Sequence, residues 1–202
     1  RAGFAMSPCP HDTGGEGSAG RGQALSARLP EGPGLGGGVQ TRFDAVGLGN
    51  AIVDALVRID DETVLGEYGF TRGQMTPVND GRWQEVLTKV QGAGVQMASG
   101  GSCANTVAGM GLMGAAVRYC GQIGDDELGT LYEKSMLDAC GGHALQRTPE
   151  HATGKCLSLI STSDAERTML TDLGAAVHLP GLGTFDEDIR EAGILHVTGY
   201  LM

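Results

Sequence analysis

The sequence has no apolar run long enough to span a bilayer, and it lacks the short apolar core of a secretory signal peptide. It is also short of positive charge, with 14 Lys and Arg against 24 Asp and Glu and a formal net charge of −10. Because an acidic surface repels nucleic acid and anionic membranes, we expect a soluble protein that binds neither. The 202 residues are enough for one domain of ordinary size.

None of the five cysteines forms a CxxC pair, and their odd number disfavours a disulfide framework. The two histidines closest in sequence, His143 and His151, have no pattern of cysteine or carboxylate ligands around them. We therefore predict no metal site, since zinc sites need several ligands at close spacing. Unpaired cysteines suit a reducing compartment, so the sequence predicts a cytoplasmic protein.

Residues 1–40 hold eleven of the 35 glycines and four of the seven prolines, and no apolar periodicity runs through them. Such a segment cannot bury enough apolar surface to offset its chain entropy. A targeting peptide is the alternative, but three acidic residues balance three arginines there and no amphipathic stripe is present. We predict a disordered Gly/Pro-rich tail over residues 1–41 and a folded region over residues 42–202.

From Phe43 onward, short apolar runs alternate with stretches of helical periodicity. The pattern predicts helices from Asp60 and at 80–91, 103–113 and 126–139, and strands at 43–50, 51–59, 95–98, 117–120, 155–161, 167–171 and 193–198. This alternation favours an α/β fold with a mostly parallel sheet flanked by helices. The pieces near 51–59, 71–78 and 155–171 alternate polar and apolar residues, so we expect them to form a second, small and exposed β-sheet.

The segment Ser99-Gly100-Gly101-Ser102-Cys103-Ala104-Asn105-Thr106 lies between a predicted strand and a predicted helix. Two adjacent glycines let the backbone approach a ligand, because no Cβ is in the way. The amide of Asn105 offers both a donor and an acceptor, a combination that suits a sugar hydroxyl. From the residues alone, a plain strand-to-helix turn with Asn105 inside the helix is an equal alternative.

A longer pattern surrounds this segment. Residues 100–106, with Gly109, Gly111 and Gly114, and then Gly121-Gln122-Ile123-Gly124-Asp125-Asp126-Glu127-Leu128-Gly129, resemble the first signature of the PfkB family of carbohydrate and nucleoside kinases. Residues 47–54, 166–175 and 195–201 also match the family, in its order, and the first two of these segments are similar to its adenosine-kinase-like branch. The resemblance covers about residues 42–202, the N-terminal half of the family's domain. It implies a ribokinase-like fold with a small β lid.

The resemblance implies substrate-binding roles for five residues. Asp54 would accept hydrogen bonds from hydroxyls of the bound sugar or ribose, and a charged acceptor makes such bonds strong. Asn50 would support that pocket, Gly100 and Gly101 would pack against the sugar, and Asn105 would bond a hydroxyl. The strands near 51–59, 71–78 and 155–171 would form the lid, which closes over the substrate and excludes water.

Three other features receive no substrate role. Arg167 lies in the lid region, where a solvated charge is the preferred interpretation. The turn at 124–126 is expected to shape a strand–helix junction, with Asp126 near a helix N-terminus. The Gly47-Leu48-Gly49 segment could begin a dinucleotide-binding fingerprint. That motif, however, needs a third glycine where this chain has Ile52, and a helix where this chain stays extended.

The family's second signature, a Gly-Ala-Gly-Asp segment, does not occur in the 202 residues. In the family it provides the general base and the N–H groups that stabilise the transferred phosphate, and the ATP site lies in the same half. We therefore assign no catalytic residue to this chain and expect ATP and Mg²⁺ to bind mostly outside it. We also expect the 202-residue polypeptide alone to be inactive and marginally stable, with an outer strand near Thr198 that exposes apolar surface.

For the intact protein, the resemblance implies transfer of the γ-phosphate of Mg-ATP to a hydroxymethyl group of a sugar or nucleoside. Adenosine is the first candidate acceptor, followed by ribose and fructose. Two alternatives stay open: a non-catalytic sugar- or nucleoside-binding module, and an interaction protein that forms a homodimer through the lid.

Overall fold

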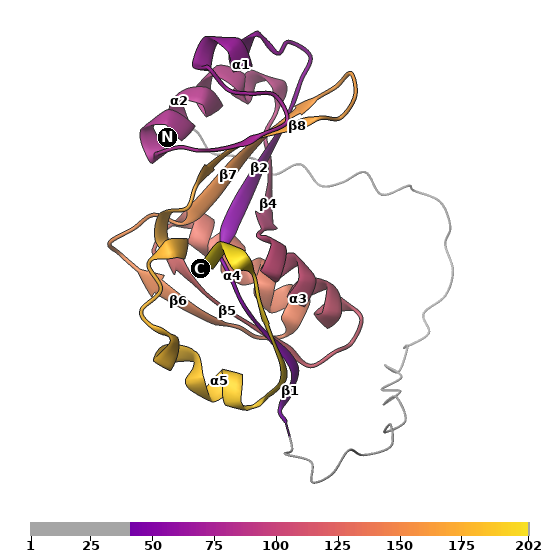
Figure 1. Cartoon of the computed structure of the whole chain (residues 1–202), viewed down its shortest axis with the longest axis vertical. Coiled ribbons are helices and arrows are strands. Elements are labelled where there is room, and N and C mark those ends of the chain that lie inside the picture. Colours follow the sequence, from indigo (N-terminus) through magenta and orange to yellow (C-terminus); the bar gives the residue numbers. More distant parts are fainter. Residues whose placement is uncertain (1–40, 202) are drawn as a thin grey trace, which may run out of the picture. The chain divides into compact units, whose positions relative to one another are not determined.

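The computed structural model describes residues 41–201, so the predicted tail over residues 1–41 lies, but for Thr41, outside the described residues (Figure 1). The described residues form two sheets. The main sheet has four parallel strands in the order β6 (Ala144–Thr148), β5 (Val117–Gly124), β1 (Phe43–Leu48) and β9 (Ala192–Val197). The lid sheet has five strands in the order β3 (Met75–Pro77), β8 (Arg167–Asp172), β7 (Gly154–Ser161), β2 (Ile52–Ile59) and β4 (Gln96–Gly100).

The lid sheet is mixed. Strands β2 and β7 are parallel, as are β3 and β8, whereas β4 is antiparallel to β2 and β8 is antiparallel to β7. The predicted second sheet is thus confirmed, and the strand predicted at 95–98 joins it as β4. The chain stays extended after β1, as the argument against a dinucleotide-binding fingerprint expected, because β1 is followed directly by the strand β2.

Helices cover both faces of the main sheet and one face of the lid sheet (Figure 1). Helices α3 (Ser102–Leu112) and α4 (Glu127–Cys140) pack on one face of the main sheet around Tyr119, Val107 and Met136. Helix α5 (Asp186–Arg190) lies over the other face, where Phe185 is fully buried against Val46 and Cys120. Helices α1 (Thr63–Tyr68) and α2 (Asp80–Val90) cover one face of the lid sheet. The short 3₁₀ turns are η1 (Gln91–Ala93), η2 (Gly174–Val177), η3 (Leu182–Phe185) and η4 (Gly199–Leu201).

The two lid helices begin in different ways. Helix α2 confirms the helix predicted at 80–91 and has a side-chain cap: the side chain of Asn79 accepts a hydrogen bond from the Arg82 amide, and Trp83, Val86 and Val90 are buried. Helix α1 begins at Thr63 rather than at the predicted Asp60. The reason is local, because the Asp61 carboxylate accepts hydrogen bonds from the amide and the hydroxyl of Thr63 and so closes a turn before the helix.

The main sheet ends at β9, which pairs with β1 on one side. Three of its apolar side chains are exposed: Ile194, Leu195 and Val197. The predicted outer strand with exposed apolar surface is confirmed, although the strand ends one residue before Thr198.

Candidate functional site

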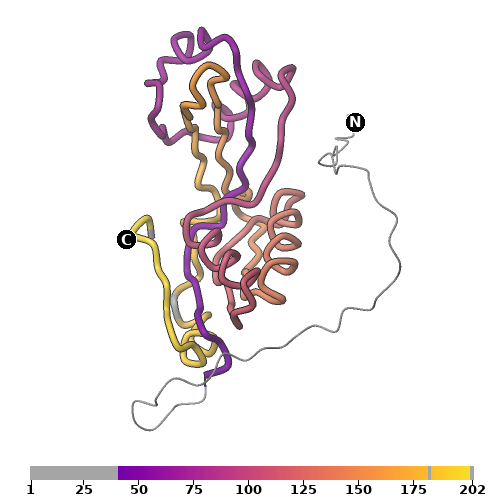
Figure 2. Tube along the Cα trace, turned by 90° about the vertical axis from the view of Figure 1, so that its right-hand side faces the viewer, coloured from indigo at the N-terminus to yellow at the C-terminus, as the bar shows by residue number. Residues whose placement is uncertain are grey.

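The predicted site residues gather where the chain passes between the two sheets. Within the described residues it crosses four times: after β1, after β4, before β7 and after β8. Figure 2 shows the first crossing as the run that leads from β1 directly into β2. Asn50 lies on this first crossing, and Gly100 and Gly101 lie on the second. The carboxyl ends of the parallel strands β1 and β5 point toward this junction, the position where open α/β sheets bind ligands.

Asp54 lies on β2 and projects from the face of the lid sheet opposite α1 and α2. Ala55 and Val57 pack with the side chains of α1 and α2, and side chains alternate along a strand, so Asp54 points to the other face. Its register partners are Ala98 on β4 and Cys156 on β7, so small side chains flank the carboxylate. The half-buried carboxylate can therefore face a ligand that lies against the lid sheet.

Gly100 and Asp54 are in close contact. A Cβ on Gly100 would lie 2.5 Å from the Asp54 Cγ and closer still to one carboxylate oxygen. Burial raises the pKa of Asp54 above its ordinary value, and the positive charge of Arg167 opposes that rise. Arg167 is exposed, as the interpretation as a solvated charge expected, and it influences Asp54 through its charge alone.

Asn50 and Gly101 form the second contact of the site. Gly101 has a φ of 95°, and a Cβ there would lie 2.5 Å from the carbonyl oxygen of Asn50, so a glycine is needed on both counts. Asn50 is only 7% exposed, and its side-chain Oδ1 has no hydrogen-bond partner among the described residues. A buried polar atom without a partner is costly, so this oxygen is available to accept a hydrogen bond from a ligand or a water molecule.

Asn105 lies inside α3, one turn after Gly101, as the turn interpretation expected. Its amide donates to the Gly101 carbonyl at 2.9 Å, and its side chain is exposed. No hydrogen bond among residues 41–201 joins that side chain to Asp54 or Asn50. The structure thus pairs Asp54 with Gly100 and Asn50 with Gly101, and it leaves Asn105 open to solvent at the start of α3.

Asp126 caps the start of α4, as predicted, and its carboxylate also holds the crossing before β7 in place. Its carboxylate accepts from the Gly129 amide at 2.8 Å and from the amide and hydroxyl of Thr153 at 2.8 and 2.6 Å. Burial alone would raise the pKa of Asp126, but these hydrogen bonds hold it below its ordinary value. Thr153 was missed by the sequence analysis, because no local pattern links residue 153 to the β5–α4 turn.

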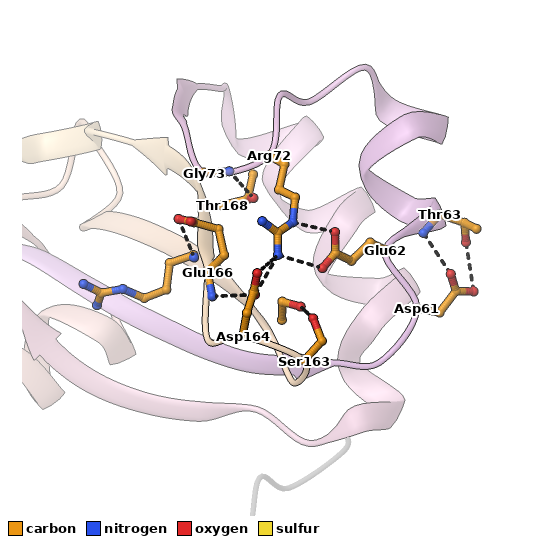
Figure 3. Close-up of polar contacts among 11 residues, drawn as sticks. Asp61, Glu62, Thr63, Arg72, Gly73, Ser163, Asp164, Glu166 and Thr168 are labelled. Carbon is orange, nitrogen blue, oxygen red and sulfur yellow. Dashed lines mark hydrogen bonds and ion pairs between the residues drawn. The ribbon is translucent and has the colours of Figure 1, made fainter.

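At the tip of the lid sheet, Arg72 joins two loops (Figure 3). Its guanidinium lies 2.8 Å from Glu62, just before α1, and 2.6 Å from Asp164 in the β7–β8 turn. The Gly73 amide donates to the Thr168 hydroxyl on β8 at 3.0 Å. These contacts bind α1 and the hairpin into one unit, although pairs as exposed as these stabilise a fold only weakly.

Other features of the described residues give weaker support for a binding site. A surface depression of about 420 Å³ is lined by Asp125, Asp126, Glu127 and Thr130 and includes none of the predicted site residues. Between residues 41 and 201, no group of three His, Cys, Asp or Glu side chains is placed to hold a metal ion. No helix in the same range is long and apolar enough to cross a membrane.

Fold and site together define an α/β protein in which a small second sheet lies at the carboxyl ends of a parallel sheet, with a candidate ligand site at their junction. The chain belongs to the pfkB family of carbohydrate kinases, whose family profile matches residues 75–202. No curated protein matches the chain.

Solved structures agree with this assignment. An adenosine kinase from Sinorhizobium meliloti is 32% identical with a TM-score of 0.70, over 79% of this chain and 48% of that one. A probable sugar kinase from Rhizobium etli is 30% identical with a TM-score of 0.68, over 80% of this chain and 48% of that one. An Anopheles gambiae adenosine kinase in complex with P1,P4-di(adenosine-5) tetraphosphate shares the fold at 19% identity, with a TM-score of 0.68, over 78% of this chain and 50% of that one. The chain therefore spans about half the length of these proteins.

Proposed function

We propose that the full-length protein transfers the γ-phosphate of Mg-ATP to a hydroxymethyl group of a sugar or nucleoside, and that this chain supplies the acceptor-binding half. Adenosine is the first candidate acceptor, with ribose and fructose next. The proposal is supported by the family membership and by the similarity to an adenosine kinase and a sugar kinase at 30% identity or more.

One observation gives the main support for the proposed acceptor site. The buried Oδ1 of Asn50 has no partner among the described residues. Asn50 lies on the crossing that leads directly into β2, the strand that carries the half-buried carboxylate of Asp54. Both groups accept hydrogen bonds, so the ligand they fit is one that donates several, as a polyol or a ribose does. Gly100 and Gly101 leave the backbone side of that space free of side chains, and the exposed Asn105 amide can add a further bond.

The phosphate-transfer machinery is expected to lie mostly outside this chain, and we assign neither Mg²⁺ nor ATP to any of the described side chains. When bound, ATP supplies the phosphoryl group. The chain's own residues bind and orient the acceptor and, through the lid sheet, exclude water. The described cysteines carry free thiols, in keeping with a reducing, cytoplasmic location.

The test is an ADP-release assay on the full-length protein with adenosine, ribose and fructose, run beside calorimetric titration of each acceptor. We expect turnover with at least one acceptor, and we expect Asp54→Ala to lower kcat/KM by about 100-fold or more, the loss of two charged hydrogen bonds. Asp138→Ala, which removes an exposed acid from α4, is the matched control and should leave the kinetics unchanged.

The outcomes separate the alternatives. Acceptor binding that Mg-ATP does not change, with no ADP released, would favour a non-catalytic binding module. A homodimer that dissociates when the lid strands are altered, with no acceptor bound, would favour an interaction protein. The 202-residue polypeptide assayed alone is expected to release no ADP.

A further inference from the structure

Two hydrogen bonds join α4, a helix of the main sheet, to the last two residues of β4 in the lid sheet. The hydroxyl of Tyr132 donates to the carbonyl oxygen of Gly100 at 3.1 Å, and the hydroxyls of Ser135 and Ser99 lie 2.6 Å apart. Residues three apart lie on the same face of a helix, so both bonds leave α4 side by side. We call these two bonds the α4 tether.

One bond of the α4 tether ends at Gly100, the glycine whose backbone contacts the Asp54 carboxylate. Gly100 has no side chain through which its position could be fixed, and its backbone contacts the Asp54 carboxylate. A bond to the Gly100 carbonyl also fixes the plane of the Gly100–Gly101 peptide, because a trans peptide is rigid and its C=O and N–H point in opposite directions. The Tyr132 hydroxyl therefore adds, to the pairing of Gly100 with Ile52 on β2, a second restraint on the surface beneath Asp54 and on the direction of the Gly101 N–H.

The surroundings of Tyr132 make this bond durable. The side chain is fully buried, and its ring lies 6.1 Å from the ring of Tyr119 at an angle of 49°. Burial raises the pKa of Tyr132 above the ordinary value of a tyrosine, so the hydroxyl keeps its proton and stays a donor near neutral pH. A bond formed away from water is also not exchanged readily for a bond to solvent.

We propose that Tyr132 is a positioning residue of the acceptor site: through the Gly100 carbonyl it holds the glycine turn, and with it the Asp54 carboxylate, in the arrangement that binds the acceptor. The inference rests on the proposed function, because it assigns Tyr132 to that same site. Tyr132 does not touch the acceptor in this account and takes no part in phosphate transfer.

The test compares Tyr132→Phe with the wild type in the full-length protein, using adenosine, ribose and fructose as probes. Loss of one buried hydrogen bond should raise the acceptor Kd and KM by about 3- to 10-fold, with kcat and the KM for ATP unchanged. Tyr68→Phe is the matched control, since it removes a tyrosine hydroxyl on α1, which packs in a different cluster from Tyr132 and makes no hydrogen bond among residues 41–201. That control should bind the acceptor as the wild type does.

Ser135→Ala is a second, milder variant that removes the other half of the tether. It should raise the acceptor Kd by about 2- to 5-fold, and it tests the inference even if Tyr132→Phe fails to fold. Acceptor affinities equal to wild type in both tether variants would overturn the positioning role while leaving the proposed function intact. A wild-type protein that binds none of the three acceptors would overturn both. A uniform loss of acceptor affinity, ATP affinity and kcat would show a structural role alone and would also overturn the inference.

Discussion

The contact between Gly100 and Asp54 makes Gly100→Ala a sharp probe of the candidate site. Gly100 lies in a β-strand, where alanine is also allowed, so the backbone need not change. The new Cβ would lie 2.5 Å from the Asp54 Cγ, whereas non-bonded carbons settle at about 3.5 Å or more. Since the nearest atoms belong to the end of a side chain, the Asp54 carboxylate is expected to give way by about 1 Å.

The size of the effect follows from that displacement. A shift of about 1 Å is enough to break a charged hydrogen bond, which contributes about 1.5–3 kcal/mol. The acceptor Kd should therefore rise by about 10- to 100-fold. The thermal stability should change little, because the Asp54 side chain can turn toward solvent without opening the core.

Acceptor titration and a thermal melt of the full-length protein measure the two quantities. Gly109→Ala is the matched control: it lies in α3, nothing is within 4 Å of its added Cβ, and a helical alanine should stabilise the protein by about 0.5–1 kcal/mol. If Gly100→Ala binds acceptor as tightly as Gly109→Ala does, the carboxylate of Asp54 is not part of the acceptor site and the reasoning fails.

Three further changes test the charges of the fold. Because burial raises the pKa of Asp54, its ionised form opposes folding as the pH rises through that pKa. Asp54→Asn should therefore melt higher than wild type at pH 7, with the gap closing in acid, while acceptor binding is lost. Asp126 has a lowered pKa, so it stabilises the fold above about pH 4 and this contribution disappears as the pH falls through the folded value. Asp126→Asn should melt several degrees lower at pH 7 and differ less from wild type near pH 3. Lys155 is 3% exposed, packs on Trp83 and pairs with the exposed Asp80. In urea unfolding, Lys155→Met should retain most of the stability, whereas Lys155→Ala should lose about 1–3 kcal/mol of packing.

The sequence allowed much of this site to be predicted because its residues are adjacent in short motifs. Gly100 and Gly101 stand at the end of a strand and before a helix, and a pair of glycines there has a direct structural cause in the backbone of Asn50 and the carboxylate of Asp54. The position of Asp126 at the start of α4 could also be predicted, since an acidic residue just before a helical segment caps the helix locally.

Pairings between residues far apart in the sequence could not be predicted in the same way. Residues 96–100 alternate in burial, but alternation does not say which sheet a strand joins, and β4 pairs with β2 some forty residues earlier. The strand β6 was missed because its apolar run is short and interrupted by polar residues. The hydrogen bonds of Tyr132 and Thr153 reach partners about thirty residues away in the sequence, and no pattern in the neighbouring residues predicts them.

The glycine content of the folded region follows from the way the crossings meet. A Cβ on Gly101 would press on the Asn50 carbonyl, and a Cβ on Gly174, whose φ is 45°, would overlap the Ala152 carbonyl. In each case the obstacle is the backbone of another crossing, which cannot rotate away as a side chain can. The crossings are therefore held against one another by their main chains. Gly100 and Gly101, which contact Asp54 and Asn50, belong to this junction, so we expect the geometry of the proposed acceptor site to be set where the two sheets meet.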